Sequence, residues 1–179
     1  MTAGASAAHE ASRARQEVSQ YQQLARESLE RARRYELAQR TELSVEGSLR
    51  ALTTLGWRVL ADRRWAGSRR GNVDFLLIGP GGVVVVDVKA WRALQLRGGS
   101  VFCEDECRDD EVSKLLSLTD RVQDSVSLLG LTPQALHPVM VFAGRRLQER
   151  TQRVHLVGEG DIAGWIGRLT DRLDKEQVD

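Results

Sequence analysis

Residues 72–91 read NVDFLLIGPGGVVVVDVKAW, and this stretch decides the fold. Two runs rich in β-branched residues flank a Gly-Pro-Gly-Gly sequence, a pattern typical of a β-hairpin. Pro80 pre-sets the backbone for the first central turn position, and Gly81 suits the positive φ that a type II turn requires next. The sequence therefore predicts two antiparallel strands, over residues 72–79 and 83–90.

The turn also sets the register of the two strands. If Gly79 pairs with Gly82, counting back places Asp74 opposite Asp87. Directly opposed residues of an antiparallel pair have Cβ atoms roughly 5 Å apart. Because side chains alternate between the faces of a strand, Asp87 and Lys89 share a face, and we expect Asp74 to point to the same one.

The second strand is apolar on both faces over residues 83–88, which is typical of a central, covered strand. Two opposed carboxylates at such a position repel each other and are costly to desolvate. A divalent cation can hold both, and Mg²⁺ prefers a few carboxylate oxygens together with water and substrate phosphate. We therefore predict a metal site at Asp74 and Asp87 for phosphodiester hydrolysis, with Lys89 stabilising charge or orienting the attacking water. In the alternative interpretation, Asp87 and Lys89 lie near solvent and Asp74 simply pairs with Lys89.

Residues 44–130 resemble the nuclease-related domain family (NERD), a branch of the PD-(D/E)XK nuclease superfamily. The resemblance lies in GWRVL at 56–60, NVD at 72–74, GPGGV at 79–83 and DVKAW at 87–91. The arginine-rich helical lead-in is similar to that of bacterial members with high-GC genomes. The resemblance implies a restriction-endonuclease-like core, a DNA substrate, Mg²⁺ or Mn²⁺ as the cofactor, and catalytic residues at Asp74, Asp87 and Lys89.

The chain departs from the family pattern on the helix that precedes the sheet. The family carries a Glu there in a Gly-x-x-Gly-Glu run, whereas the matching run SVEGS at 44–48 ends on Ser48. Glu46 is the first candidate to replace that acid, although it lies off the edge of the inward stripe, and Glu42 is a second, poorer candidate. That stripe comprises Val45, Leu49, Leu52 and Leu55. If neither acid reaches the metal, the protein would bind DNA without cutting it.

Composition limits how nucleic acid can be attracted. The chain has 179 residues, of which 28% are charged and 41% hydrophobic, and its net charge is only +1, so no global basic field exists. DNA contacts must come from local patches. The best candidate comprises Arg63, Arg64, Arg69 and Arg70, which bracket the loop before the Asp74 strand, because guanidinium groups suit phosphate recognition. A solvated loop without a role is the alternative.

Other apolar patterns predict the rest of the fold. Helices are expected at 42–55, 110–130 and 161–173, and further strands near 57–62, 94–97, 100–104, 138–143 and 154–158. This order indicates an α/β (α+β) protein whose mixed central sheet is flanked by helices, as in the nuclease superfamily. Three acids at 109–111 should complement the dipole of the second helix.

The N-terminal region has a different composition. Residues 7–40 are rich in Ala, Arg, Glu and Gln without Pro or Gly, which predicts a long helix. Its apolar stripe is too thin for a lone helix to be stable, so it should pack on another copy or on its own domain. A broken heptad seam comprises Val18, Tyr21, Ala25, Ala32 and Tyr35. We therefore expect a helical arm at 1–40, which could form a homo-oligomer, and a nuclease-like domain at 41–179.

The sequence shows neither an apolar run long enough to span a bilayer nor an N-terminal signal peptide, so we expect a cytoplasmic protein. Cys103 and Cys107 lack the further ligands that zinc would need, and two reduced thiols are expected.

Three functions remain open at this point. The first is a Mg²⁺- or Mn²⁺-dependent deoxyribonuclease. The second is a nuclease fold with a degraded site that acts as a DNA-binding or protein-interaction scaffold, a view motivated by Ser48. The third, judged from the arm alone, is a self-assembling structural protein.

Overall fold

The computed structural model describes residues 4–64, 72–91, 93–127 and 131–178. The chain divides into two compact units, Met1–Gln39 and Arg40–Asp179. Helix α1, Ala5–Arg50, contributes residues to both units and passes into a short 3₁₀ segment, η1, Ala51–Leu55. The expected separate helix at 42–55 is therefore the end of α1, because no Pro or Gly interrupts residues 5–46.

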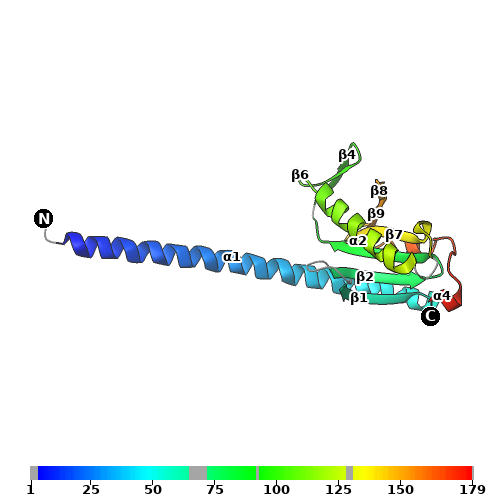
Figure 1. Ribbon diagram of the computed structural model, residues 1–179. Helices are drawn as coiled ribbons and strands as arrows, with labels where there is room; N and C mark the ends of the chain where they lie inside the picture. The colour runs from blue at the N-terminus through cyan, green and yellow to red at the C-terminus, as the bar shows by residue number, and fades with distance from the viewer. Residues whose placement is uncertain (1–3, 65–71, 92, 128–130, 179) are drawn as a thin grey trace. The chain divides into compact units, whose positions relative to one another are not determined.

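The second unit is built on a six-stranded mixed sheet in the order β1-β2-β3-β7-β9-β8 (Figure 1). Strands β1, β2 and β3 pair antiparallel, β3, β7 and β9 pair parallel, and β8 returns antiparallel to β9. The bounds are β1 Arg58–Arg64, β2 Asn72–Gly79, β3 Gly82–Lys89, β7 Leu136–Phe142, β8 Gln148–Thr151 and β9 Val154–Gly158. This is the mixed α/β fold that the sequence predicts.

A smaller antiparallel sheet follows β3 in the chain. It comprises β4 Leu94–Arg97, β5 Ser100–Cys103 and β6 Glu106–Cys107, in that order. Helix α2, Asp109–Ser127, starts directly after it and places Asp109, Asp110 and Glu111 in its first turn, as expected. Residues 128–130 of the predicted helix lie outside the described residues.

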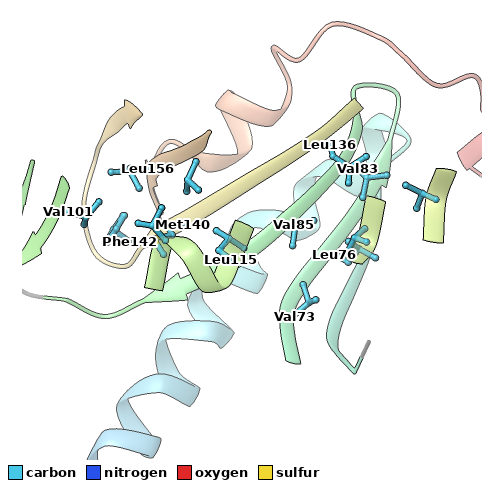
Figure 2. Close-up of a cluster of buried hydrophobic side chains, with 14 residues drawn as sticks. Val73, Leu76, Val83, Val85, Val101, Leu115, Leu136, Met140, Phe142 and Leu156 are labelled. Atoms are coloured by element: carbon cyan, nitrogen blue, oxygen red, sulfur yellow. The ribbon is translucent and has the colours of Figure 1, made fainter. Parts of the chain in front are cut away.

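Alternate residues of β3 face two separate core layers. Val83 and Val85 pack in one layer with Leu115 of α2, and Figure 2 shows these side chains gathered with those of neighbouring strands. Val84 and Val86 pack in the other layer, with Val45 and other residues of α1 and with α3, Ile162–Ile166. Both faces of β3 are therefore covered, as the continuous apolar run predicts. Leu55, expected in the inward stripe, is instead exposed, because the 3₁₀ segment changes the helical phase.

The hairpin has the register that its turn predicts. The strand pairs run from Gly79 with Gly82 to Phe75 with Val86, and β3 starts and ends one residue earlier than expected. Continuing this register by one pair places Asp74 opposite Asp87. The first acid therefore lies at the end of the sheet where β3 finishes.

The turn itself differs from the type II expectation. The positive φ falls at Gly82, at 117°, and not at Gly81. A Cβ at position 82 would lie 2.2 Å from the carbonyl oxygen of Ala135, in the 3₁₀ segment η2, Pro133–Ala135. Glycine is therefore required at position 82 both by its backbone conformation and by the close approach of the segment leading into β7.

The predicted final helix, 161–173, is wrong in length. Only α3 is helical there, followed by a turn and by the short helix α4, Lys175–Val178. Gly164 and Gly167 weaken the helix, and the backbone N–H groups of Arg172 and Leu173 both donate to the carbonyl of Pro80, at 2.7 and 3.0 Å. The helical spacing of apolar residues reflects packing on the sheet, with Leu173 buried outside any helix. Strands β6 and β8 were not predicted.

In the first unit, α1 exposes most of its large apolar side chains. Val18, Tyr21, Leu24, Leu29 and Tyr35 are each more than half exposed. None of the helices in the described ranges is long and apolar enough to cross a membrane.

Candidate active site

The neighbouring ends of β2 and β3 bring together three of the side chains that the sequence selects. Asp74 lies near the start of β2, and Asp87 and Lys89 lie at the end of β3. The backbone N–H of Val88 donates to Asp74 Oδ2 at 2.7 Å, so the first acid holds the backbone of the second strand where the ladder stops. Asp87 and Lys89 lie on the face of Val85, toward α2.

Lys89 is held between two carboxylates. Its Nζ donates to Asp87 Oδ1 at 3.1 Å and to Glu111 Oε2 at 2.9 Å, and only 16% of its side chain is exposed. Burial alone would lower the pKa of Lys89, but the charges of Asp87 and Glu111 outweigh burial and raise it. The ammonium is therefore charged at neutral pH and serves as a fixed cation and not as a base.

Asp87 keeps an unused acceptor atom despite this contact. Its Oδ2 lies 2.9 Å from the nitrogen of Lys89, yet this buried oxygen accepts no hydrogen bond within the described part of the chain. Burial raises the pKa of Asp87 to about 6, with the Asp74 charge acting in the same direction against Lys89. A buried carboxylate with a spare oxygen is suited to a further cation.

The pKa of Asp74 is raised in the same way as that of Asp87. Burial raises its pKa to about 6, and the charge of Glu42 adds to burial, whereas the hydrogen bond from Val88 acts in the opposite direction. Asp74 and Asp87 are therefore both harder to ionise than an exposed carboxyl group, even though Lys89 lies nearby. Carboxyl groups with raised pKa values beside a fixed cation are common at functional sites.

The structure separates the two acids of α1 that the sequence offers. Glu42 is half-buried, and this burial raises its pKa. The negative charges of Asp62 and Asp87 act in the same direction. Glu46 points elsewhere, since its carboxylate pairs with Arg50 at 3.0 Å, one turn along the same helix. Ser48 is half-buried. Of the two, Glu42 is therefore the acid whose charge reaches the Asp74–Asp87 pair.

The two acids differ in their position along α1 and not in the face that they occupy, because residues four apart lie one turn from each other on the same face. The buried face contains Thr41, Val45 and Leu49. Of the inward stripe expected from the sequence, Val45, Leu49 and Leu52 are buried and Leu55 is exposed.

Two further acids belong to this cluster and were not singled out from the sequence. Asp62 of β1 has a φ of 46° and accepts a hydrogen bond from Asn72 Nδ2 at 2.7 Å. Its charge acts on Asp74 and on Glu42. Glu111 pairs with Lys89, and Lys114 donates to its other oxygen at 2.7 Å. An acid at the start of α2 gave no sequence signal beyond its match to the helix dipole.

The arginines proposed to contact DNA are only partly placed. Arg63 and Arg64 lie at the end of β1, opposite Val73 and Asn72, because β1 extends two residues further than predicted. Arg63 is exposed. Arg69 and Arg70 lie outside the described residues.

The donor set fits a small hard cation with few protein ligands. In the described ranges, no group of three or more His, Cys, Asp or Glu side chains is close enough to form a metal cage. A pair of carboxylates with one spare buried oxygen suits Mg²⁺, which keeps several waters and takes one or two carboxylates. Asp74 and Asp87 are the residues that could hold it.

Comparison with known families agrees with this geometry. The model of the nuclease-related domain (NERD) matches residues 37–143, which is more than half of the chain. The chain belongs to the nuclease-related domain family. No curated protein and no solved structure matches it. The matched segment of this nuclease-related domain contains Glu42, Asp74, Asp87, Lys89 and Glu111 and ends before β8.

Proposed function

We propose that this nuclease-related domain hydrolyses DNA phosphodiester bonds, using Mg²⁺ or Mn²⁺ held by Asp74 and Asp87. One observation carries the proposal: two half-buried carboxyl groups with raised pKa values adjoin a lysine whose pKa is also raised, within the segment that matches the family. Burying that combination is costly without a ligand to compensate it.

Each residue has a distinct role in the proposal. The Val88 N–H fixes the orientation of Asp74, and Glu111 fixes Lys89 from the other side. The ammonium of Lys89 stabilises the negative charge that develops on the phosphate as the attacking water adds. When bound, the cation supplies Lewis-acid polarisation of the phosphate and makes a bound water more acidic.

Glu42 completes the site in this proposal. Burial raises the pKa of Glu42, and the charges of Asp62 and Asp87 act in the same direction, which supports Glu42 as the substitute for the helix acid that the family usually places at the position of Ser48. Glu46, whose carboxylate is engaged by Arg50, is left in a structural role. We propose that Arg63 and Arg64, and with them Arg69 and Arg70, contact the DNA backbone near the Asp74 strand.

The test is metal-dependent cleavage of plasmid and oligonucleotide DNA. We expect Asp87→Ala and Lys89→Ala each to lower the rate at least about a hundredfold, because the first removes a metal ligand and the second removes positive charge complementary to the transition state. Lys175→Ala, which removes an exposed lysine of α4, is the matched control and should leave the rate unchanged. Cleavage that survives both site substitutions would exclude this assignment.

A scaffold that binds DNA without cutting it is the second candidate. The observation in its favour is that the described residues contain no three-ligand metal group. Isothermal titration with Mn²⁺ separates the two functions. Binding that disappears in Asp74→Asn supports the nuclease, whereas no heat at millimolar Mn²⁺ supports the scaffold.

We also propose that the helical arm pairs with a second copy of this chain. Large apolar side chains of the first unit are exposed, among them Val18, Tyr21 and Tyr35. Burying them against a partner helix would stabilise the arm. Size-exclusion chromatography with light scattering on the full chain and on residues 40–179 tests this. A full-length monomer at all concentrations would contradict it.

A further inference from the structure

A second site lies at the opposite edge of the six-stranded sheet. It is a hollow of about 390 Å³, a size usual for small-molecule sites. It lies on the face of Val84 and Val86, whereas Asp87 and Lys89 lie on the face of Val85. Its lining comes from β8, β9 and α3, outside the family match, and comprises Gln148, Glu149, Arg150, His155, Val157 and Trp165.

Aromatic rings form one wall of this hollow. The imidazole of His155 lies 4.7 Å from the ring of Trp165, tilted by 50°, and His137 meets the same indole edge-on at 6.2 Å. His137 is fixed in turn, since its Nε2 lies 3.1 Å from the carbonyl oxygen of Gly81 and must donate to it. Trp165 is only partly buried, so a flat apolar surface remains accessible beside a rigid cluster.

Two arginines, Arg150 and Arg168, and the carboxylate of Glu149 supply the charges around these rings. Arg150 pairs with His155 across the two strands, is exposed, and forms no ion pair with any residue that the structure describes. Arg168 donates to Gln148 Oε1 at 3.1 Å. Burial lowers the pKa of His155 to about 4, and the charges that add to burial come from Arg150 and His137.

The pKa of the second imidazole, that of His137, is lowered as well. Burial lowers the pKa of His137, and the charge of Arg172 acts in the same direction. Both imidazoles therefore stay neutral at physiological pH, and the guanidinium groups alone supply the charge. Such a hollow combines an exposed guanidinium group, an amide and a carboxylate for hydrogen bonds, and an aromatic surface.

We propose that this hollow binds a nucleoside 5′-phosphate, either as a free nucleotide or as the terminal nucleotide of a DNA strand. Arg150 binds the phosphate, the base packs against the Trp165 and His155 rings, and Gln148 with Glu149 contacts the polar edge of the base. The inference rests on the proposed function in one respect, since that function supplies DNA ends and nucleotides as the relevant ligands.

The experiment measures binding to the full-length protein in EDTA, so that the Asp74–Asp87 site does not contribute. The probes are the four deoxynucleoside 5′-monophosphates and a short single strand with or without a 5′-phosphate, titrated by calorimetry. Arg150→Glu should weaken binding about tenfold to a hundredfold, as expected for the loss of a hydrogen bond to a charged group. Trp165→Leu should weaken it as well, and Arg121→Glu, an exposed arginine of α2, should not.

The outcomes separate the sources and the two sites. Binding of mononucleotides supports the free ligand, and binding of only the phosphorylated strand supports a strand end. No binding of either probe at millimolar concentration, or Arg150→Glu binding as tightly as the wild type, overturns the inference. Asp87→Asn should bind as the wild type does. A protein that binds nucleotide in EDTA but never cleaves DNA would overturn the proposed function alone.

Discussion

Burial shifts pKa values in opposite directions in two charged regions of the same sheet. At the end of β3, burial raises the pKa values of Asp74 and Asp87 to about 6. At the β8 edge, burial lowers the pKa of His155 to about 4. The physical cause is the same, because loss of solvent disfavours whichever form is charged. The acids that remain ionised attract a cation, whereas the neutral imidazoles leave the arginines to attract an anion.

This difference indicates that the two regions could bind different components of one reaction. In our proposals, the acidic end would hold the cation that a phosphodiester needs for hydrolysis, and the basic edge would bind the phosphate-bearing nucleotide. The two regions also differ in origin within the chain, since only the first lies inside the family match at 37–143.

The sharpest test of the acidic region compares the two acids of α1. We expect Glu42→Gln to lower DNA cleavage about tenfold to a hundredfold, the range seen when a group that tunes a metal site is removed. Glu46→Gln should cleave at nearly the wild-type rate, because its carboxylate engages Arg50 outside the cluster. Steady-state cleavage of a fluorescent oligonucleotide measures both. The reverse result, with Glu46 essential, would move the site one turn along α1.

The second test concerns stabilisation by metal. Because Asp74 and Asp87 repel each other in the metal-free protein, Mn²⁺ should bind the folded state and raise the melting temperature. At a free concentration of a hundred times its Kd, the gain in unfolding free energy is about 2.7 kcal/mol. Differential scanning calorimetry against an NaCl control of equal ionic strength measures it. Asp87→Asn should abolish the gain, and an unchanged gain in that variant would place the metal elsewhere.

The third test removes a buried charge from the metal-free protein. The folded-state pKa of Asp74, about 6, lies above its ordinary value of 3.8, so the folded state binds more protons between these values. The unfolding free energy therefore falls as pH rises through this window, and the penalty is fully present above pH 6.

Asp74→Asn keeps an acceptor for the Val88 N–H and removes the penalty. We expect it to raise the unfolding free energy at pH 7.5 by about 1–2 kcal/mol, after a discount for partial exposure. Urea denaturation in EDTA measures the change. Asp124→Asn, which changes an exposed acid of α2, is the control, and a destabilised Asp74→Asn protein would contradict the repulsion argument.

The smallest effect is expected at the basic edge, with the opposite sign. The pKa of His155 is lower in the folded protein than its ordinary 6.5, so the unfolded state binds more protons as pH falls from 7 toward 4. Its contribution to stability is lost over that range. His155→Gln should reduce the loss by about 1 kcal/mol, since the ring is half-exposed, while His9→Gln in the arm should not. Parallel denaturation curves at pH 7 and pH 5 provide the measurement, and equal losses in the wild type and His155→Gln would remove the basis for a desolvated imidazole.

The sequence alone determined the hairpin, its register and the gathering of Asp74 with Asp87 and Lys89 at one sheet end. These follow from local rules: a turn of known length fixes the pairing, and a period of two fixes the faces. Only the tertiary structure decided that Glu42 and not Glu46 lies near the pair, that Asp62 and Glu111 join it, and that His155, Trp165 and Arg150 line a hollow. Those contacts depend on where along its length a helix docks on the sheet and on the docking of segments far apart in the chain, which packing sets and local spacing does not.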